Sequence, residues 1–278
     1  MDWSKSKNLL LIMLAAVNLM LLGTIYFENK KYEDKTKTHV FVEKTQSILN
    51  NYGIDLSCEI PTDQDGLNVV EVSFESIEPQ KLNHDFFDSK ATVVNAGKLI
   101  TYEYKDETLS VINSKRLLYE KEIEKTGSLD ADEAIKMAEE FFESKNISTD
   151  DMSLKVIEIN NDETILKYHK LYKGRTVETS YTNVYVTNDG VSRLDRLWVN
   201  VLSESATKTY INSASKALLS LIGEENRGKI ITDIELCYYF DPEEQGYVED
   251  ITKTLKGRAL PAWRIQFSDG EFLIIDNI

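Results

Sequence analysis

A run of mostly apolar residues from Leu9 to Phe27 lies close to the start of the chain, and no comparable run follows it. As an α-helix, which rises about 1.5 Å per residue, the run would be about 29 Å long, close to the thickness of a bilayer's hydrocarbon core. A cleaved signal peptide has a shorter apolar region, about 7–15 residues, and small residues at its cleavage site. Here the bulky Ile25, Tyr26 and Phe27 occupy that point, and the two aromatic residues suit the membrane interface. The run therefore predicts an uncleaved transmembrane helix over residues 9–27, after a short amino terminus of residues 1–8.

Asn18 is the only strongly polar residue in this run, which argues against the alternative of a helix buried in a soluble core. Near the middle of a membrane its amide has no water to bond and is costly unless paired. Small residues on the opposite stripe would let a second backbone approach closely. We therefore predict two partner-binding faces, with a plain tether as the alternative. The predicted residues are Ala15, Asn18 and Leu22 on one face, and Ala16, Met20 and Gly23 on the other.

The lysines around the run do not decide on which side of the membrane the remainder lies. Two of them, Lys5 and Lys7, precede the run, and four follow it within ten residues of its end: Lys30, Lys31, Lys35 and Lys37. Taken alone, this count leans against a cytoplasmic amino terminus. Long domains cross membranes largely regardless of charge, so the residues leave the orientation open.

The part of the chain after residue 27 is long enough for one large domain or two ordinary ones. The whole chain carries 32 Lys and Arg against 47 Asp and Glu, a net charge of −15, and such a surface repels nucleic acid and anionic lipid. The acidic residues are spread along the chain, and 14 Tyr with 10 Phe argue against disorder. We expect a folded, acidic body that does not bind nucleic acid.

The first part of the body shows one helical pattern followed by strand patterns. Apolar spacing predicts a helix over 39–52, and NVVEVSF (68–74) alternates as a half-buried strand. LITYEYKDETLSVIN (99–113) is typical of a hairpin that turns near residues 105–107. We place the joint between two α+β lobes at Thr126-Gly127-Ser128, which gives a first lobe over 28–127 and a second over 128–278.

The second lobe contains two similar units, each a helix followed by strands. Asp130 with Glu133 forms a capping-box pattern at the start of one helix, and Ser213 caps the other, which we expect Gly223 to close. Each unit ends in a hairpin with Asp-Gly at its turn, at 189–190 and at 269–270. These matching distances predict a diverged repeat of helix plus hairpin. In the strand KIITDIELCYYF we expect Cys237 on the less buried face.

The helix-plus-hairpin unit, which ends in AWRIQFSDGEFLIID, resembles the PepSY module. The amino terminus is more specific: MDWSK runs directly into an apolar helix on a chain with acidic, β-rich lobes. In this layout the chain resembles the YycI (WalI) family, accessory regulators of the WalK/WalR (YycG/YycF) cell-wall two-component system of Gram-positive bacteria. The resemblance implies a short cytoplasmic amino terminus, one membrane span and an extracytoplasmic body of helices packed on antiparallel sheets. It also implies two partners, the sister protein YycH and the sensor histidine kinase.

No motif for a common catalytic chemistry is present: the sequence lacks HExxH, GxSxG and a P-loop. The two cysteines, Cys58 and Cys237, lie far in sequence from the three histidines, so a zinc site is not indicated. His169 falls in a strand pattern, where we expect it to fill a face. Residues 63–66 lack the further ligands of a calcium loop. We therefore expect neither an enzyme nor a bound cofactor or metal.

Two functions remain open from the sequence. One is a regulator of the sensor kinase that acts through contacts in the membrane and outside it. The other is a tethered PepSY-like binding module that inhibits an extracellular peptidase or senses a ligand, with the helix as an anchor only.

Overall fold

The structure is a computed structural model that describes residues 3–31, 35–62, 66–123, 127, 129–240 and 256–276; for 3–6, 9, 25–31 and 35–38 it describes the backbone alone. The helices are α1 (Trp3–Lys31), α2 (Lys35–Asn51), α3 (Pro79–Phe87), α4 (Ala131–Ser144), α5 (Ala214–Leu219) and the short 3₁₀ turn η1 (Glu224–Asn226). The strands are β1 (Asp55–Leu56), β2 (Leu67–Phe74), β3 (Thr92–Asn95), β4 (Leu99–Tyr104), β5 (Glu107–Ile112), β6 (Arg116–Lys121), β7 (Met152–Ile159), β8 (Thr164–Tyr172), β9 (Arg175–Thr187), β10 (Gly190–Leu197), β11 (Val199–Thr209), β12 (Ile230–Tyr239), β13 (Lys256–Phe267) and β14 (Phe272–Ile275).

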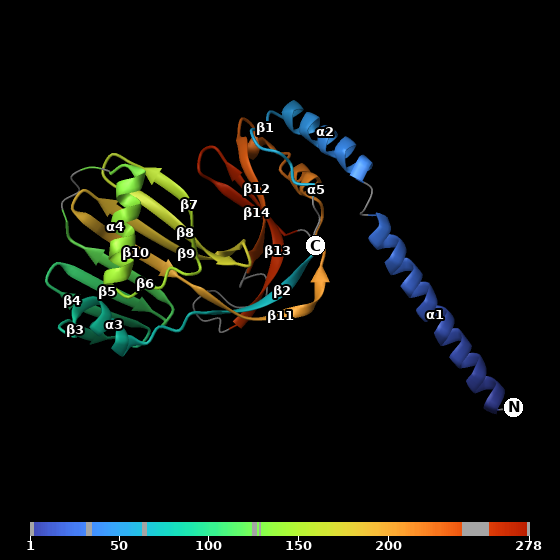
Figure 1. Cartoon of the computed structure of the whole chain (residues 1–278), viewed down its shortest axis with the longest axis horizontal. Helices are drawn as coiled ribbons and strands as arrows, with labels where there is room; N and C mark the ends of the chain where they lie inside the picture. Colours follow the sequence, from blue (N-terminus) through green and yellow to red (C-terminus); the bar gives the residue numbers. More distant parts are fainter. Residues whose placement is uncertain are drawn as a thin grey trace.

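The described strands form one hydrogen-bonded sheet with the order β11-β2-β13-β12-β9-β10-β6-β5-β4-β3, from which β1, β14, β8 and β7 branch. We call strands β3 to β10 with α3 and α4 the α4 half, and strands β1, β2 and β11 to β14 with α2 and α5 the α5 half. Figure 1 shows these two halves side by side, with α1 extending away from the α5 half. Backbone pairing joins the halves where β12 runs parallel to β9, at the pair Tyr238 and Val177.

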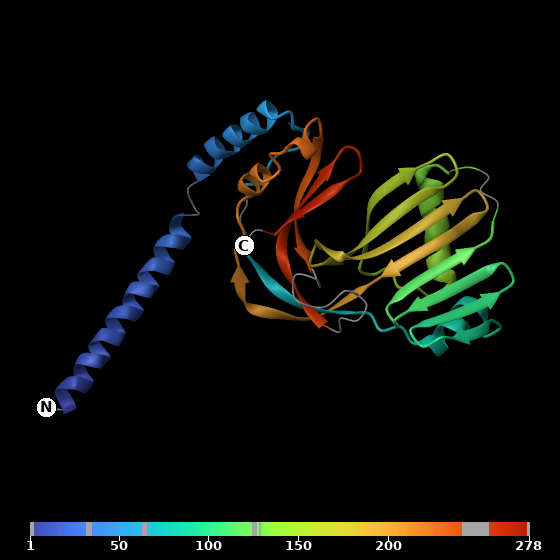
Figure 2. The ribbon, with the colours of Figure 1, turned by 180° about the vertical axis from the view of Figure 1, so that it is seen from behind.

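The α4 half is an antiparallel sheet with both of its helices packed on one face. Asp130 accepts a hydrogen bond from the backbone N–H of Glu133 at 2.9 Å, which confirms the predicted start of α4. The helix buries Ala134, Ala138 and Phe142 against the sheet. Figure 2 shows the opposite face of this sheet, which α4 does not cover. This half therefore has one face in the core and one face turned outward.

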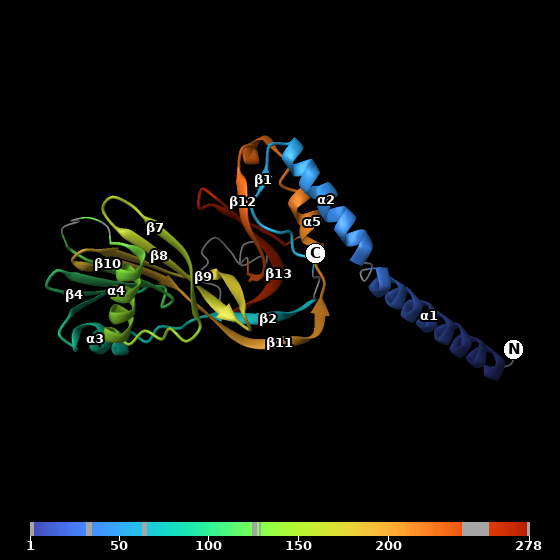
Figure 3. The ribbon, with the colours of Figure 1, turned by 45° about the horizontal axis from the view of Figure 1, so that its top comes forward.

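The α5 half contains two further hydrophobic clusters. In one of them Leu49 of α2 packs with Leu218 of α5 and Trp263 of β13, and Figure 3 shows α2 lying beside α5. In the other, Val72 of β2 packs with Phe240 and Ala259. Segments from both ends of the chain thus build this half, because α2 and β2 precede the α4 half in sequence.

Most of the predicted elements are confirmed at their positions. The helix over 39–52 is α2, the strand at 68–74 is β2, and the first hairpin turns at Lys105, between β4 and β5. The Asp-Gly turns join β9 to β10 and β13 to β14, with Gly190 at φ 120° and Gly270 at φ 88°. These positive φ angles explain the glycines, since side-chain-bearing residues rarely adopt them.

One local prediction is wrong here, and two strands were missed. Gly223 does not close α5: the helix ends at Leu219, and Gly223 is extended and precedes η1. The mixed, charged stretch from Lys115 contains β6, because its alternating Leu117 and Tyr119 fill the core. β7 lies between α4 and β8, so the first unit has one more strand before its hairpin.

The proposed joint at residues 126–128 lies mostly outside the described residues, and the lobe boundary there stays a prediction. Three strand pairings cross that position. β6 pairs with β10, and β2 pairs with both β11 and β13. Asp63, Gln64 and Asp65, considered as a calcium loop, also lie outside the described residues.

Within the part of the chain whose residues are described, no helix combines the length and the apolar character needed to cross a membrane. The transmembrane helix over 9–27 therefore stays a prediction.

Candidate functional site: a buried polar junction between two halves

The six residues predicted to bind partners all lie on α1. The side chains of Ala15, Ala16, Asn18, Met20 and Leu22 are exposed, with 77% of Met20 and 63% of Leu22 accessible. A Cβ atom added at Gly23 would find no other atom within 4 Å. These positions are thus free to take a partner, and their role stays a prediction.

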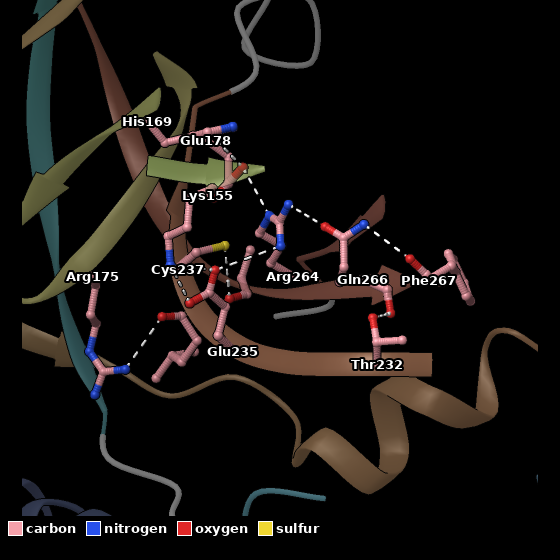
Figure 4. A network of polar contacts seen from close by, with 12 residues as sticks. Lys155, His169, Arg175, Glu178, Thr232, Glu235, Cys237, Arg264, Gln266 and Phe267 are labelled. Carbon is pink, nitrogen blue, oxygen red and sulfur yellow. Dashed lines mark hydrogen bonds and ion pairs between the residues drawn. The ribbon is translucent and has the colours of Figure 1, made fainter. Parts of the chain in front are cut away.

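A network of charged side chains lies where the two halves meet (Figure 4). In its centre the carboxylate of Glu178 on β9 lies 3.2 Å from Nδ1 of His169 on β8 and 3.4 Å from Nε of Arg264 on β13. Lys155 on β7 donates two hydrogen bonds to Glu235 on β12, at 3.1 and 2.9 Å. The pairs Glu178–Arg264 and Lys155–Glu235 therefore each connect the α4 half to the α5 half.

Burial makes the centre of this network electrostatically strong. The side chains of Glu178 and Arg264 are 1% and 3% exposed, and that of His169 is 8% exposed. Burial alone raises the pKa of Glu178, but the imidazole of His169, with help from Thr176 and Arg264, outweighs it and leaves the pKa below its ordinary value. Glu178 is therefore a buried carboxylate held in its charged form.

The contacts at Glu178 are ionic in character and are not well-formed hydrogen bonds. Both Glu178 carboxylate oxygens, Nδ1 of His169 and Nε of Arg264 are buried without a hydrogen bond of good geometry among the described residues. Arg264 does find one good acceptor, since its Nη2 donates to Oε1 of Gln266 at 2.6 Å. Its guanidinium also lies 4.6 Å from the centre of the Phe272 ring, which covers the network from β14.

Further contacts hold the same junction along β9 and β12. Nη1 of Arg175 donates to the carbonyl of Leu236 at 3.4 Å, and the backbone N–H of Phe240 donates to Oγ1 of Thr179 at 3.2 Å. Tyr172 and Tyr238 meet edge to face, with ring centres 5.9 Å apart. Because the backbone supplies little pairing between β9 and β12, these side chains carry much of the connection.

The prediction that Cys237 lies on the less buried face of its strand is wrong. Its side chain is completely buried, and its thiol donates to the carbonyl of Ala262 at 3.3 Å. Burial raises the pKa of this thiol well above its ordinary value, and Glu178 and Glu235 raise it further. The alternation failed because the side chains of the junction, among them Glu178 and Arg264, lie over the face of β12 that carries Cys237. Cys58 is half-buried, and both cysteines are free.

Sequence reasoning missed the junction, although one signal for it was present. His169 was expected to fill a face, and it does lie buried, but opposite Glu178. Arg264 stands between Trp263 and Ile265, in the mostly apolar stretch 259–265, and a charge in such a stretch must find a partner. The pattern could therefore have marked Arg264 as paired, but it does not identify Glu178 as the partner.

The geometry of the junction suits holding two parts together. Among the described residues, no group of three or more His, Cys, Asp and Glu could hold a metal ion. The expectation that the chain is not an enzyme rests on the sequence, which lacks the HExxH, GxSxG and P-loop motifs.

Similarity to solved structures gives the fold a context. An uncharacterized protein from Eubacterium rectale ATCC 33656 aligns with a TM-score of 0.52 and 10% identity, over 80% of this chain and 86% of that one. YycH from Bacillus subtilis aligns with a TM-score of 0.51 and 15% identity, over 74% of this chain and 52% of that one. The chain thus spans about half the length of the YycH structure. At these identities the likeness shows a shared α+β, sheet-rich fold alone.

The resemblance to the PepSY module stays a prediction. The C-terminal domain of YpeB from Bacillus megaterium aligns with a TM-score of only 0.41 and 6% identity, over 73% of this chain and all of that domain. No curated protein matches the sequence.

The sequence itself matches a family model over most of its length. The model, described as YycI protein, covers residues 33–274 and therefore includes α2, both halves and the junction between them. The chain belongs to the YycI family.

Proposed function

We propose that the chain is a membrane-anchored regulatory protein of a cell-wall two-component system. In this proposal it modulates a WalK-like sensor histidine kinase through contacts in the membrane and outside it. A YycH-like sister protein is its second partner. The amino terminus is cytoplasmic, residues 9–27 cross the membrane once, and the body is extracytoplasmic.

The observation that carries the proposal is the YycI family match over residues 33–274. The sequence of residues 9–27 supports the anchor, because Asn18 is the only strongly polar residue in this run of nineteen. The exposed apolar side chains of α1, such as Leu19 at 70% and Leu21 at 56%, support it as well. In water such a helix would leave an apolar surface on every side.

Labelling from outside the cell tests the orientation. Glu140 is a suitable position because its side chain is 66% exposed on α4. In intact, wall-stripped cells, a membrane-impermeant maleimide should label the Glu140→Cys variant. The unchanged chain, with Cys58 half-buried and Cys237 buried, gives the background. Labelling that appears only after lysis would place the body in the cytoplasm and overturn the proposed orientation.

Exchange of the anchor tests whether the helix takes part in regulation. We would replace residues 9–27 by an unrelated membrane span and measure autophosphorylation of the kinase in membranes that hold equal amounts of either chain. A regulator that works through its helix should lose its effect on the kinase. A tethered module that inhibits a peptidase or senses a ligand should keep its function after the swap. An equal effect of both chains on the kinase would therefore contradict the proposed membrane contacts.

A further inference from the structure

A cleft of about 780 Å³ opens between α4 and β7, on the face of the sheet that carries the helices. Leu154 of β7 and Tyr168 of β8 line it, whereas their chain neighbours Lys155 and His169 belong to the junction network. The cleft and the network therefore lie on opposite faces of these strands. Its walls come from α4, the loop after it, β7 and β8. The lining residues are Ile135, Glu139, Phe142, Glu143, Ile147, Ser148, Thr149, Asp150, Met152, Leu154 and Tyr168.

The wall of the cleft that the sheet forms is apolar apart from the hydroxyl of Tyr168. Met152 and Leu154 are only partly buried, although they belong to the core cluster of the α4 half. Tyr168 pairs with Leu154 across β8 and β7, is 8% exposed, and meets Phe142 edge to face with ring centres 5.5 Å apart. Its buried hydroxyl has no hydrogen-bond partner among the described residues. A buried hydroxyl without a partner is costly, so a ligand that bonds to it would remove that cost.

The rim of the cleft carries only one sign of charge. Glu139 and Glu143 are exposed on successive turns of α4, Asp150 lies on the loop, and no lysine or arginine lines the cleft. The negative charge of Glu139 also acts on Tyr168 inside the cleft. Burial, with a smaller contribution from this carboxylate, raises the pKa of Tyr168 to about 12. An occupant with a positive charge near the rim is therefore favoured over a neutral or an anionic one.

One wall of the cleft is a free strand edge. Within the described part of the chain, β7 pairs with β8 alone, and Figure 1 shows it at one edge of the α4 half. Ile157 and Ile159 of this strand are 38% and 58% exposed. An edge strand beside a helix, with an apolar cleft between them, is the arrangement by which protein domains bind an extended peptide as an added strand.

We propose that the cleft between α4 and β7 binds an extended peptide segment of a partner protein, with apolar side chains and at least one lysine or arginine. The peptide backbone pairs with β7, its apolar side chains enter the cleft beside Met152 and Leu154, and its basic side chain lies by Glu139 and Glu143. A backbone or side-chain group of the peptide bonds to the Tyr168 hydroxyl. This inference is independent of the proposed function, since it needs neither the membrane anchor nor the kinase.

Selection from a random library of eight-residue peptides displayed on phage tests the proposal. The target is the full chain in detergent, with the bare support for counter-selection, and the same selection runs in parallel on the double variant Glu139→Lys, Glu143→Lys. We expect the natural chain to enrich peptides that have an apolar residue at every second position and contain lysine or arginine. No enrichment over the double variant, or enrichment of anionic peptides, would overturn the proposal.

Affinities of the enriched peptides, as fluorescein-labelled synthetic copies, then locate the site. The double variant should raise Kd about tenfold or more, because it places like charges at the rim. The matched control Glu140→Lys changes a carboxylate of the same helix that does not line the cleft, so it should leave Kd unchanged. Equal Kd values for all three chains would show that the peptides bind elsewhere and would refute the site.

Two further measurements distinguish a loss of peptide binding at the cleft from a loss caused by misfolding of a variant. Tyr168→Phe should raise Kd about two- to tenfold, the range of one hydrogen bond, without lowering the unfolding midpoint of the free chain, since the hydroxyl has no partner to lose. A bound peptide should slow hydrogen exchange of the backbone amides in residues 152–159. If the Tyr168→Phe chain binds the peptide as tightly as the natural chain, the hydroxyl does not bond to the peptide. If the bound peptide does not slow exchange in β7, the peptide does not pair with this strand.

Discussion

Replacement of Arg264 by methionine is expected to lower the free energy of unfolding by about 3–5 kcal/mol, because it removes the permanently charged partner of the buried carboxylate of Glu178. Arg264 lies 3.4 Å from Glu178 and 3.8 Å from Glu235, and its side chain is 3% exposed. Methionine retains the apolar bulk that packs against Phe272. The loss thus reports mainly on charge. Urea unfolding of the full chain in detergent, followed by tryptophan fluorescence and by circular dichroism together, is the measurement.

The double variant Arg264→Met, Glu178→Gln separates the ion pair from simple damage to packing. Once the carboxylate is also gone, most of the lost stability should return, since removing both members of a buried pair is often nearly neutral. The exposed carboxylate of Glu140, changed to glutamine, should alter stability by less than about 1 kcal/mol. If Arg264→Met alone costs no more than the Glu140→Gln control, the junction does not depend on this pair.

The same carboxylate gives the junction a dependence on pH with a definite sign. The pKa of Glu178 in the folded chain lies below its ordinary value of 4.5, so the unfolded chain takes up a proton first as the pH falls. The charged carboxylate contributes its full stabilisation above about pH 4.5, and this contribution is lost as the pH falls through the pKa of Glu178 in the folded chain. Glu178→Gln should therefore lose less stability than the natural chain over that acidic range.

Local features of the fold could be predicted from the sequence because their causes are local. The cap at Asp130, the cap at Ser213 and the glycine turns at 190 and 270 depend on a few neighbouring residues, and all lie where the sequence indicates. Alternation likewise located β2 and β8. The pairing of strands depends on contacts distant in sequence, and no pattern indicated that β2 would join β11 and β13.

The junction could not be predicted for the same reason. Glu178 and Arg264 lie 86 positions apart in the sequence, and only the parallel approach of β12 to β9 brings them together. The error at Cys237 also has this origin, because Glu178, one of the side chains that cover its face of β12, comes from a strand distant in sequence. The family, in contrast, was recognised from residues 1–5 and the apolar run, whereas the family model matches 33–274. Two separate parts of the chain therefore indicate the same family.

Asn18→Leu combined with Gly23→Ile is expected to remove most of the co-purification of this chain with the kinase and the YycH-like protein from membranes. The reason follows from the proposed span. Lipid tails are as apolar as leucine, so helices in a membrane associate through close packing and polar contacts. Asn18 offers the polar contact on one face. Gly23 leaves room for another backbone on the opposite face, where isoleucine would clash.

The single variant should have a smaller effect than the double variant. Hydrogen bonds between membrane helices contribute about 0.6 kcal/mol on average and about 1.7 kcal/mol at most, so Asn18→Leu alone should weaken the complex without abolishing it. A matched control changes Leu10 to isoleucine and Val17 to leucine, since these two exposed residues lie between the two stripes at helical spacing. That control should co-purify at the natural level.

The outcome separates a helix that binds partners from a helix that only anchors. Expression and membrane insertion of all variants are matched first by quantitative blotting of the membrane fraction, because a helix that inserts poorly would also lose its partners. If the double variant then retains both partners as well as the control does, the contacts lie outside the membrane and the helix is a tether. If it loses one partner and retains the other, each face of α1 serves a different protein. In that case Asn18→Leu and Gly23→Ile, tested singly, assign the faces, because each changes only one stripe.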